Sequence, residues 1–437
     1  MKRLFVQSFG CQMNVVDGEL MASAFRRAGY APAASAGQAD VVLVNTCAVR
    51  EHAEERVFSH LGQLRRLKEH RPGLVLGVCG CMAERLGSEI ARRAPHVDVI
   101  AGARSFGGIV GLAEAVRGGA GPQVSVGHDE PPPDRDVTVR TDRYRAYVAV
   151  SRGCDHHCTF CIVPATRGRE RGRPLTEVVD EVRRLVADGV VEVTLLGQNI
   201  DSYGKDRPAG EDLHRLLRAC HAVAGLKRLR FVTSHPGDME LEVLDDLAEL
   251  PRMCGALHTP PQSGSNRVLK RMARGYTREL YLEVVRELRR RDPDGEVAAD
   301  FIVGFPGETE EDFEQSVTLM EEVRFQQSFV FRYSPRPGTP SAARFQDDVP
   351  APVKAARNLR LLKTQERVSL ERHRRMVGRT FEVLVEGSSK KDASQLAGRT
   401  RGNFIVHFPG GSDLAGELVE VTVTGATPVS LRGRIAG

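Results

Sequence analysis

The chain has 437 residues, of which 41% are hydrophobic, and a formal net charge of +5. This length suits two to four domains, and the charge permits a nucleic-acid partner without being histone-like. No run of 18 apolar residues predicts a membrane span, and Gln7 and Ser8 interrupt the apolar start that a signal peptide would need. We therefore expect a cytoplasmic protein without membrane association, in which the nine cysteines stay reduced.

Short apolar runs alternate with helical patterns in residues 1–118. The predicted strands are RLFVQ, VVLVN, LVLGV and VDVIAG, and segments such as GELMASAFRRAGY are predicted helices. This alternation is typical of βαβ units and predicts an α/β domain with an open parallel sheet. The stretch that follows is rich in Gly, Pro and charge and contains the run Pro131–Pro133, so we interpret residues 119–139 as a linker.

The same alternation continues in residues 140–372. The predicted strands are YVAVS, VEVTLLG, RLRFVTS, GALHTPP, VAADFIVGF and QSFVFRY, and helices such as LTEVVDEVRRLVADG lie between them. Six βα units in series predict a partial or full (β/α) barrel. A helix from Pro352 to Arg375 leads to residues 373–437, where FEVLVEG, FIVHFP, LVEVTVTG and SLRGRI predict a small β-barrel.

Three cysteines, Cys154, Cys158 and Cys161, follow the first of these strands within eight residues. Active sites of (β/α) barrels form at such strand ends. Three thiolates can hold three irons of a [4Fe–4S] cube and leave the fourth iron open. The alternative is zinc, but His156 and His157 lie too close to Cys158 in sequence to complete a tetrahedral site well. The spacing resembles that of the radical S-adenosylmethionine (SAM) family, in which SAM binds the open iron.

The later barrel strands each end in a polar or glycine-rich motif. These motifs are LLGQN, TSHP, PQSGS and GFPGE. Any one of them is explained equally well by ordinary turn chemistry, but their recurrence on successive strands favours a ligand site, because glycines let the backbone approach a ligand closely. We predict that Gln198, Ser234 and Gln262 contact SAM.

Three further cysteines each follow a strand of the N-terminal sheet. Cys11, Cys47 and Cys81 are separated by 36 and 34 residues, about one βαβ unit each. Ligands bind beyond the carboxyl ends of the strands in open α/β sheets. Free cysteines are usually buried small hydrophobic residues, but these three lie in loops with Gly and Asn. We therefore predict a second three-cysteine cluster.

Cys79 is the alternative to Cys81 as the third ligand. It lies within the predicted strand end, whereas Cys81 follows Gly80 as Cys11 follows Gly10. We assign Cys79 to packing. Two other cysteines, Cys220 and Cys254, have no cysteine partner at ligand spacing and are also interpreted as core residues.

With six cysteines placed, the whole chain resembles the methylthiotransferase family, which joins an N-terminal cluster domain, a radical SAM barrel and a TRAM domain. The signatures GCQMN, NTCAVREHAE and LLGQNIDSYG resemble the tRNA branch that makes 2-methylthio-isopentenyladenosine, and CTFCIVPATRGRER and QSGSNRVLKRMARGYT fit it too. Two departures are Thr259 before Pro260, where the family usually has Leu or Met, and Ala165, where a Tyr is usual. Neither involves a cluster cysteine.

The resemblance implies a reaction and a set of partners. A methylthio group is inserted at C2 of isopentenyladenosine, 3′-adjacent to the anticodon, using two SAM molecules and two [4Fe–4S] clusters. The barrel cluster cleaves SAM, and the N-terminal cluster carries the sulfur. The implied partners are the tRNA anticodon loop, a reductant such as flavodoxin or ferredoxin, and a sulfur donor or iron–sulfur carrier. We expect a monomer.

Arginines in two segments are candidate RNA contacts. TRGRERGR places four arginines at alternate positions: Arg167, Arg169, Arg171 and Arg173. If this segment is extended they share one face and can meet phosphates, which we prefer to a solvated surface loop. In the C-terminal barrel, Arg399 and Arg401 lie near Phe404 and could combine charge with stacking.

Two other substrates and one other class of protein compete with this interpretation. The substrate could be threonylcarbamoyladenosine in tRNA or an aspartate of a ribosomal protein, but GCQMN and QNIDSYG argue against both. The chain could also be a non-catalytic RNA-binding iron–sulfur scaffold or electron carrier. The strand-end motifs PQSGS and GFPGE argue against a scaffold, since it needs no SAM pocket.

Overall fold

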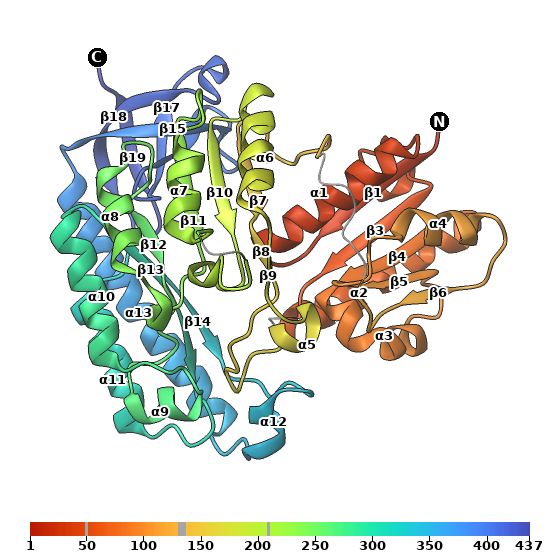
Figure 1. The fold of residues 1–437 in the computed structure, drawn as a ribbon, viewed down its shortest axis with the longest axis horizontal. Helices are drawn as coiled ribbons and strands as arrows, with labels where there is room; N and C mark the ends of the chain where they lie inside the picture. Colours follow the sequence, from red (N-terminus) through yellow and green to blue (C-terminus); the bar gives the residue numbers. More distant parts are fainter. Residues whose placement is uncertain (49–50, 130–136, 208–209) are drawn as a thin grey trace. The chain divides into compact units, whose positions relative to one another are not determined.

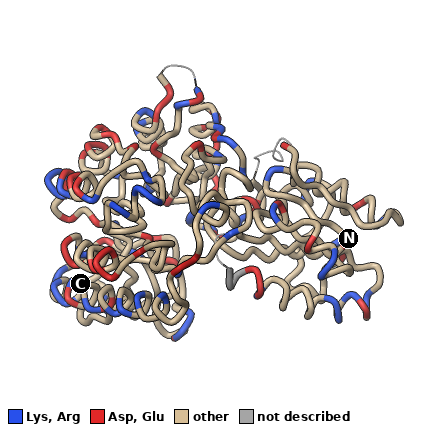
Figure 2. The backbone as a smooth tube through the Cα atoms, turned by 90° about the horizontal axis from the view of Figure 1, so that it is seen from below, with Lys and Arg blue, Asp and Glu red and all other residues tan. Residues whose placement is uncertain are grey.

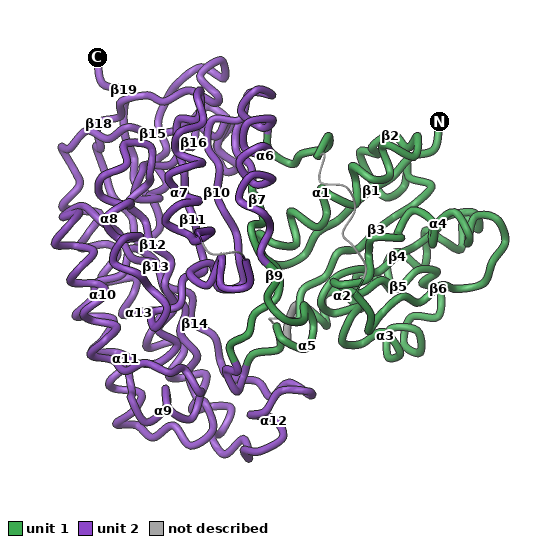
Figure 3. The backbone as a smooth tube through the Cα atoms, viewed as in Figure 1, with its two compact units in different colours: residues 1–142, 147–156, 161–171 green, residues 143–146, 157–160, 172–437 purple. Residues whose placement is uncertain are grey.

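A computed structural model describes residues 1–48, 51–129, 137–207 and 210–437 (Figure 1). The chain divides into two compact units (Figure 3). The first comprises residues 1–142, 147–156 and 161–171, and the second comprises residues 143–146, 157–160 and 172–437. The run Pro131–Pro133 of the predicted linker lies outside the described residues. Within the described ranges, no helix combines the length and apolar character needed to cross a membrane.

The first unit contains a six-stranded sheet of order β2–β1–β3–β4–β5–β6 in which every pair is parallel. Its strands are β1 (Arg3–Ser8), β2 (Ala31–Pro32), β3 (Val41–Thr46), β4 (Val75–Gly80), β5 (Val99–Gly102) and β6 (Gln123–Ser125). The predicted open parallel sheet is confirmed. The order reverses between β1 and β3, which makes this the switch point where sheets of this kind bind ligands. Strand β6 lies within the range predicted as linker, and its three residues are too short to give a pattern.

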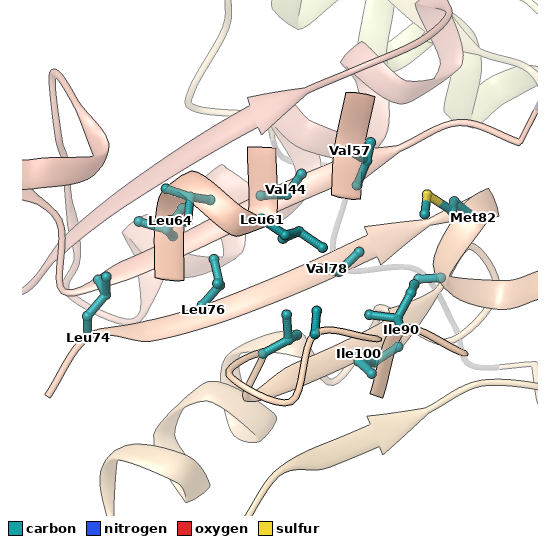
Figure 4. Packing of buried hydrophobic residues seen from close by; sticks show 14 of the residues in the cluster. Val44, Val57, Leu61, Leu64, Leu74, Leu76, Val78, Met82, Ile90 and Ile100 are labelled. Atoms are coloured by element: carbon teal, nitrogen blue, oxygen red, sulfur yellow. The ribbon is translucent and has the colours of Figure 1, made fainter. Parts of the chain in front are cut away.

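In the described part of the chain, four longer helices pack on this sheet, and a short fifth helix contacts α3. They are α1 (Gln12–Arg27), α2 (Glu51–His70), α3 (Cys81–Arg93), α4 (Ile109–Arg117) and the short α5 (Val163–Arg167), with a 3₁₀ turn η1 (Ala36–Gln38). Figure 4 shows apolar side chains of β3 and β4 packed with those of α2 and α3. Val57, Leu61 and Leu64 recur at helical spacing on α2, so one face of that helix is buried on the sheet. Both central strands are buried along their length, as their continuous apolar runs predict.

The second unit is built on parallel strands. They are β10 (Glu192–Leu196), β11 (Arg228–Val232), β12 (Ala256–His258), β13 (Glu296–Val303) and β14 (Gln327–Arg332). The sheets are β11–β10–β7 and β12–β13–β14. The unit boundary divides β7 (Arg145–Ala149), and a short β8 (Ser151–Arg152) pairs with β9 (Arg171–Gly172). Cys254 N donates to Leu229 O and Ser234 N to His258 O, both over 2.9 Å, so β12 continues beside β11. The predicted (β/α) barrel is present in its partial form.

Helices alternate with these strands. They are α6 (Leu175–Ala187), α7 (Leu213–His221), α8 (Leu241–Glu249), α9 (Asn266–Arg271), α10 (Arg278–Arg291), α11 (Glu310–Val323), α12 (Pro340–Arg344) and α13 (Ala351–Met376), with 3₁₀ turns η2 (Ile200–Ser202) and η3 (Pro236–Asp238). Thr309 and Asp312 form a capping box that fixes the start of α11 just after the GFPGE motif. Helix α13 matches the helix predicted from Pro352 to Arg375 and leads into the last domain.

The C-terminal part is a closed barrel of order β15–β16–β17–β19–β18. Its strands are β15 (Thr380–Ser388), β16 (Gln395–Thr400), β17 (Ile405–Pro409), β18 (Leu418–Ala426) and β19 (Leu431–Ile435), with a 3₁₀ turn η4 (Ser412–Leu414). Val383, Val406 and Val421 contribute to a fully buried core. The predicted small barrel is confirmed, with one strand more than the sequence indicated. QLAGRT of β16 escaped prediction because its inward positions hold a single large apolar residue, Leu396.

Candidate metal centres

The first unit brings Cys11, Cys47 and Cys81 to the carboxyl ends of three adjacent strands. Cys11 follows β1 and caps α1, Cys47 follows β3, and Cys81 is the first residue of α3, directly after β4. In the sheet order these strands are neighbours, and their parallel direction puts their carboxyl ends on one edge. The predicted convergence of these three cysteines therefore has its structural basis in the β1–β3–β4 pairing.

Two glycines allow the strand ends to approach each other. Gly10 has a φ of +131°, and a Cβ there would lie 2.4 Å from Cys47 Cβ. Gly80 has a φ of +96°, and a Cβ there would lie 2.5 Å from Thr46 O. A side chain at either position is excluded by both the backbone conformation and the neighbouring chain. These glycines precede Cys11 and Cys81, so the close approach is made at the cysteines themselves.

Two buried asparagines tie the loop after β1 to the end of β3. Asn14 Nδ2 donates to Thr46 O over 3.0 Å, and Asn45 Nδ2 donates to Asn14 O over 2.7 Å. Both side chains are fully buried. Buried amides need such partners, so this pair fixes the loop that carries Cys11 against the one that carries Cys47. The asparagines of GCQMN and VNTC therefore have a positioning role.

The three thiols influence one another electrostatically. A hydrogen bond from Cys47 lowers the pKa of Cys11 to about 6, with help from the positive charge of Arg167 and against the effect of burial. Burial raises the pKa of Cys81, and Arg167 opposes this while Cys11 adds to it. Metal ligation needs the thiolate. Cys11 thus ionises more readily than Cys81, and it is also the exposed one of the three.

A buried arginine connects this centre to an ion-pair network. Arg167 Nε donates to Cys81 Sγ over 3.2 Å, and its Nη2 donates to Asp17 Oδ2 over 2.8 Å. Arg152 Nη2 donates to the other oxygen of Asp17 over 2.5 Å. Asp17 is 1% exposed and Arg167 is 7% exposed. Burial alone would raise the pKa of Asp17, but the two arginines outweigh it and hold that pKa below its ordinary value.

The predicted extended arginine run is only partly right: Arg171 lies in strand β9, but Arg167 does not share its exposed face. Val163–Arg167 forms helix α5 with a proline in its first turn, and this turns Arg167 into the protein, where it cannot meet a phosphate. Arg173 is also buried, in an ion pair with Glu181 of 2.7 Å. Only Arg169 and Arg171 have exposed side chains, and they pair with Asp155 at 3.5 Å and Asp129 at 2.8 Å. The alternating arginines of the sequence gave no indication that helix α5 forms here.

The three barrel cysteines are divided between the two units of the chain. Cys154 and Cys161 belong to the first unit and Cys158 to the second. In the second unit Cys158 is buried, and Arg274 Nη1 donates to its Sγ over 3.2 Å. Arg274 Nη2 also donates to Pro260 O over 3.3 Å, and its Nε donates to the Tyr276 hydroxyl over 3.0 Å. Arg274 lies within the signature QSGSNRVLKRMARGYT but was not singled out, because it follows α9 outside any periodic pattern.

The three predicted SAM contacts lie at successive strand ends of the second unit. Gln198 follows β10 and Ser234 follows β11. The Ser234 hydroxyl is buried and donates to Asp201 Oδ1 over 3.0 Å. Gln262 follows β12, has a φ of 66° and bridges to Phe301 of β13. The positions are those expected of a ligand site, and contact with SAM stays a prediction.

Two carboxyl groups at these strand ends were not singled out from the sequence. Burial raises the pKa of Asp201 to about 7, although hydrogen bonds from His235 N and the Ser234 hydroxyl work in the opposite direction. Burial likewise raises the pKa of Glu308 to about 7, against the hydrogen bond from Gly304 N and the charge of Arg357. Perturbed carboxyl groups at a strand-end site are typical of functional positions.

The remaining cysteines are buried, as predicted. Cys79 lies inside β4, Cys220 in α7, and Cys254 just before β12. Burial raises the pKa of Cys79 and of Cys220 to about 12 and also raises that of Cys254. Such thiols are poor ligands and nucleophiles. The core interpretation of these three residues is confirmed.

The C-terminal barrel does not offer the predicted combination of charge and stacking. Phe404 is 4% exposed and packs in the barrel core, so its ring is closed to a base. Arg399 Nε donates to Glu386 Oε1 over 2.9 Å, and Arg401 Nη1 donates to Pro251 O over 2.7 Å. Figure 2 shows Lys and Arg interleaved with Asp and Glu along the chain. Arg399 and Arg401 could contact RNA only through the N–H groups that these hydrogen bonds do not use.

Comparison with known families defines the class of protein. Residues 3–102 match the model described as "Uncharacterized protein family UPF0004", residues 148–320 match the radical SAM superfamily, and residues 374–436 match the TRAM domain. The radical SAM methyltransferase TsrM from Kitasatospora setae superposes with a TM-score of 0.59 at 17% identity, covering 78% of this chain and 77% of that chain. The cobalamin-dependent radical enzyme OxsB gives 0.54 at 11% identity, covering 84% and 56%. At these identities the likeness shows the fold alone, an α/β domain and a partial (β/α) barrel within one chain.

Sequence relatives narrow the class. The tRNA-2-methylthio-N(6)-dimethylallyladenosine synthase of Moorella thermoacetica is 44% identical over 99% of this chain and 98% of its own length. The protein of the same name from Thermobifida fusca is 45% identical over 97% and 87%, and the one from Neisseria gonorrhoeae is 42% identical over 100% and 99%. The chain belongs to this family of radical SAM tRNA methylthiotransferases.

Proposed function

We propose that the chain inserts a methylthio group at C2 of isopentenyladenosine, 3′-adjacent to the anticodon of tRNA, using two SAM molecules and two [4Fe–4S] clusters. The observation that carries the proposal is the meeting of Cys11, Cys47 and Cys81 at one sheet edge, in a chain that also has a radical SAM motif. A radical SAM enzyme that only cleaved SAM would need the barrel motif alone. The second set of thiols supplies the place for sulfur.

Cys154, Cys158 and Cys161 are proposed to hold the first cluster. Their spacing suits three irons of one cube. When bound, the cluster offers an open iron to SAM and the electron for its reductive cleavage. Arg274 supports this assignment, because its N–H donated to Cys158 Sγ stabilises the thiolate form. The neighbouring contacts to Pro260 and Tyr276 hold the guanidinium in place.

The strand ends of the second unit are proposed to bind SAM. Gln198 and Gln262 offer amide groups, and Ser234 is held by Asp201. The buried carboxyl groups of Asp201 and Glu308 add acceptors for polar groups of the ligand. These side chains come from successive strands, as ligand contacts in (β/α) barrels do. Their proposed role is to orient SAM and to exclude water from the place where SAM is cleaved.

Cys11, Cys47 and Cys81 are proposed to hold the second cluster. The chemistry of the donor set fits it: three thiols follow adjacent parallel strands, the pKa of Cys11 is lowered to about 6, and the buried guanidinium of Arg167 donates to Cys81 Sγ. When bound, this cluster offers an open iron on which sulfur can be carried. Asn14, Asn45 and the two glycines fix the loop that carries Cys11 against the end of β3 and let the strand ends approach each other.

The proposal of a tRNA substrate rests on which domains the chain contains. We assign residues 1–118, together with strand β6 of the predicted linker 119–139, to the cluster domain, residues 140–372 to the radical SAM barrel and residues 373–437 to TRAM. The tRNA anticodon loop is the proposed substrate, with exposed Arg169 and Arg171 as phosphate contacts. A reductant such as flavodoxin or ferredoxin, and a sulfur donor or iron–sulfur carrier, complete the reaction in the cytoplasm.

Nucleoside mass spectrometry of tRNA tests the proposed function. Cells lacking the protein should accumulate isopentenyladenosine and lose its 2-methylthio form. A plasmid copy of the natural chain should restore the product, and the Cys158→Ala variant should not. Loss of a methylthio group from threonylcarbamoyladenosine, with isopentenyladenosine unaffected, would overturn the proposed substrate. An unchanged nucleoside profile would favour either the ribosomal-protein substrate or the scaffold alternative.

A further inference from the structure

The sheet β12–β13–β14 has one face that packs against helices. Side chains of a strand alternate between the two faces of its sheet. Ala299 and Phe301 of β13 are 0% and 1% exposed. Ser328 of β14 pairs with Ala299, and its hydroxyl donates to Gln365 of α13 over 2.7 Å. Asp300 lies between Ala299 and Phe301, so its side chain is on the opposite face, the inner face of the partial barrel.

Three partly exposed side chains lie together on this inner face. His258 pairs with Ala298, two residues before Asp300, and Phe329 pairs with Asp300 itself, so all three share one face. The side chains of His258 and Asp300 are 21% and 26% exposed, and Phe329 is 42% exposed. The interior of a complete (β/α) barrel is filled by packed side chains. An exposed phenyl ring beside two polar groups instead leaves a surface for a ligand.

His258 and Asp300 retain hydrogen-bonding capacity. The distance from His258 Nε2 to Asp300 Oδ1 is 3.6 Å, which is too long for a hydrogen bond. In the part of the chain that the structure describes, no other hydrogen bond or ion pair involves either side chain. Partly buried polar groups without hydrogen bonds are unfavourable. A ligand that offers an acceptor to the imidazole and a donor to the carboxylate would therefore stabilise both.

These side chains lie next to the strand ends that are proposed to bind SAM. His258 is the last residue of β12, and its carbonyl accepts from Ser234 N over 2.9 Å. The carbonyl of Asp300 accepts from Gln262 N over 3.0 Å. Ser234 and Gln262 follow their strands, whereas Asp300 and Phe329 lie within β13 and β14. The two sets of side chains are therefore neighbours that do not coincide.

The Watson–Crick edge of adenine matches the donor and acceptor on this face. In adenine the exocyclic N6–H is a donor and the adjacent N1 is an acceptor, and isopentenyladenosine keeps one hydrogen on N6. Guanine has the acceptor O6 in place of the N6 donor, and a carboxylate would repel it. Unstacked bases are recognised by hydrogen bonds to this edge and by stacking on an aromatic ring. The inner face supplies all three groups.

We propose that His258, Asp300 and Phe329 bind the target adenine of tRNA. The ring stacks on Phe329, the carboxylate of Asp300 accepts the N6–H, and the imidazole of His258 donates to N1. This deepens the proposed function and rests on it. Because C2 is bonded to N1 in the ring, the same contacts hold the reacting carbon in one position beside the SAM-binding strand ends.

The test pairs altered bases with altered side chains in the reconstituted full-length protein. The probe is a fluorescent anticodon stem–loop RNA that carries isopentenyladenosine at the target position. Two analogues of this RNA carry the 1-deaza base, which lacks N1, or the N6-methyl base, which lacks the N6–H. Dissociation constants are measured by fluorescence anisotropy for the natural chain, His258→Ala, Asp300→Ala and Phe329→Leu. His214→Ala is the matched control, because His214 of α7 pairs with Asp246 of α8 at 2.8 Å.

We expect the natural chain to bind each analogue about tenfold more weakly than the natural base, since each analogue lacks one hydrogen bond. His258→Ala should bind the natural base about tenfold more weakly and should not distinguish it from the 1-deaza base. Asp300→Ala should behave in the same way towards the N6-methyl base. Phe329→Leu should weaken binding of all three RNAs about tenfold through lost stacking, and His214→Ala should match the natural chain.

The pairing of variants with analogues separates a direct contact from a general loss of structure, which would leave the discrimination between bases intact. Equal affinity of the natural chain for all three RNAs would overturn the proposal, and so would full discrimination by His258→Ala and Asp300→Ala. A larger rise in the KM for SAM than in the KM for RNA in His258→Ala would assign the pair to the adenine of SAM and would also overturn it. Absence of any 2-methylthio product from the natural chain with SAM and a reductant would instead contradict the proposed function.

Discussion

In both candidate cysteine centres a buried arginine donates a hydrogen bond to a cysteine, but the other partners of the two arginines differ. In each, a buried arginine donates one N–H to a cysteine Sγ over 3.2 Å: Arg167 to Cys81 and Arg274 to Cys158. Arg167 is balanced by the carboxylate of Asp17, whereas Arg274 is held by a hydroxyl and a carbonyl. The barrel centre therefore keeps a full positive charge beside its thiol, and the N-terminal centre shares that charge with an acid.

The difference follows from how each centre is assembled. Cysteines within eight residues of one loop are kept together by the chain itself, and a single cation is enough to complement them. Cysteines from three strands need the strand ends to be fixed, which Asn14, Asn45 and the Asp17 network do. A dispersed centre thus depends on buried polar contacts that a contiguous motif does not require.

The largest effect is expected at the barrel centre. Cys158→Ala should reduce formation of 5′-deoxyadenosine from SAM to background, because the first cluster loses one of three thiolates. Cys220→Ala, a buried cysteine of the same unit with no proposed ligand role, should retain this activity. The product is measured chromatographically after reduction with dithionite. Undiminished cleavage by Cys158→Ala would refute the radical assignment.

Substitution of Arg274 tests whether the hydrogen bond from a buried arginine to a cysteine affects the cleavage of SAM. Arg274→Met should lower the rate of SAM cleavage about 10- to 100-fold, the usual range for a residue that hydrogen-bonds a metal ligand. It should also shift the reduction potential of the barrel cluster to a more negative value, because a positive charge beside it is lost. Potentiometric titration monitored by electron paramagnetic resonance gives that shift. Arg290→Lys, an exposed residue paired with Glu287 at 3.0 Å, serves as control, and a potential that moves equally in both variants would count against Arg274.

Asp201 gives a pH-dependent prediction that is specific to the barrel side. Its pKa is raised from an ordinary value of 3.8 to about 7, so the folded state binds its proton more tightly than the unfolded state does. Its contribution to stability is therefore greatest below about pH 4 and is lost as the pH rises towards 7. Relative to the natural chain, Asp201→Asn should gain thermal stability between pH 5 and pH 8. A difference in melting temperature that does not vary with pH would show that the carboxyl group does not titrate there.

The smallest effect is expected for tRNA binding by the first unit. Replacing Arg169 and Arg171 together with Ala should weaken tRNA binding a few-fold and lower the salt dependence of the affinity by about two ion equivalents. Arg399→Ala, at a residue that is paired with Glu386, should lower the salt dependence of the affinity less. Filter binding at several salt concentrations measures both. An unchanged salt dependence in the double variant would remove these arginines from the interface.

The sequence allowed the strands and the cysteines to be predicted, because both depend on local pattern. Continuous apolar runs mark β3 and β4, and a cysteine just past a strand end is visible without coordinates. Strands β2 and β6 are too short to give a pattern, and β16 has too few apolar residues. The arginine run was predicted only in part, for a different reason: whether Arg167 faces solvent or Asp17 is decided by helix α5 and by a residue 150 positions away.

Iron stoichiometry of the anaerobically reconstituted protein tests the central claim of two clusters most directly. The natural chain should bind about eight irons, and Cys47→Ala should bind about four while still cleaving SAM, since only the N-terminal centre loses a ligand. Mössbauer spectra should assign the remaining iron to one [4Fe–4S] cluster. About four irons in the natural chain, with no change in Cys47→Ala, would contradict the second cluster.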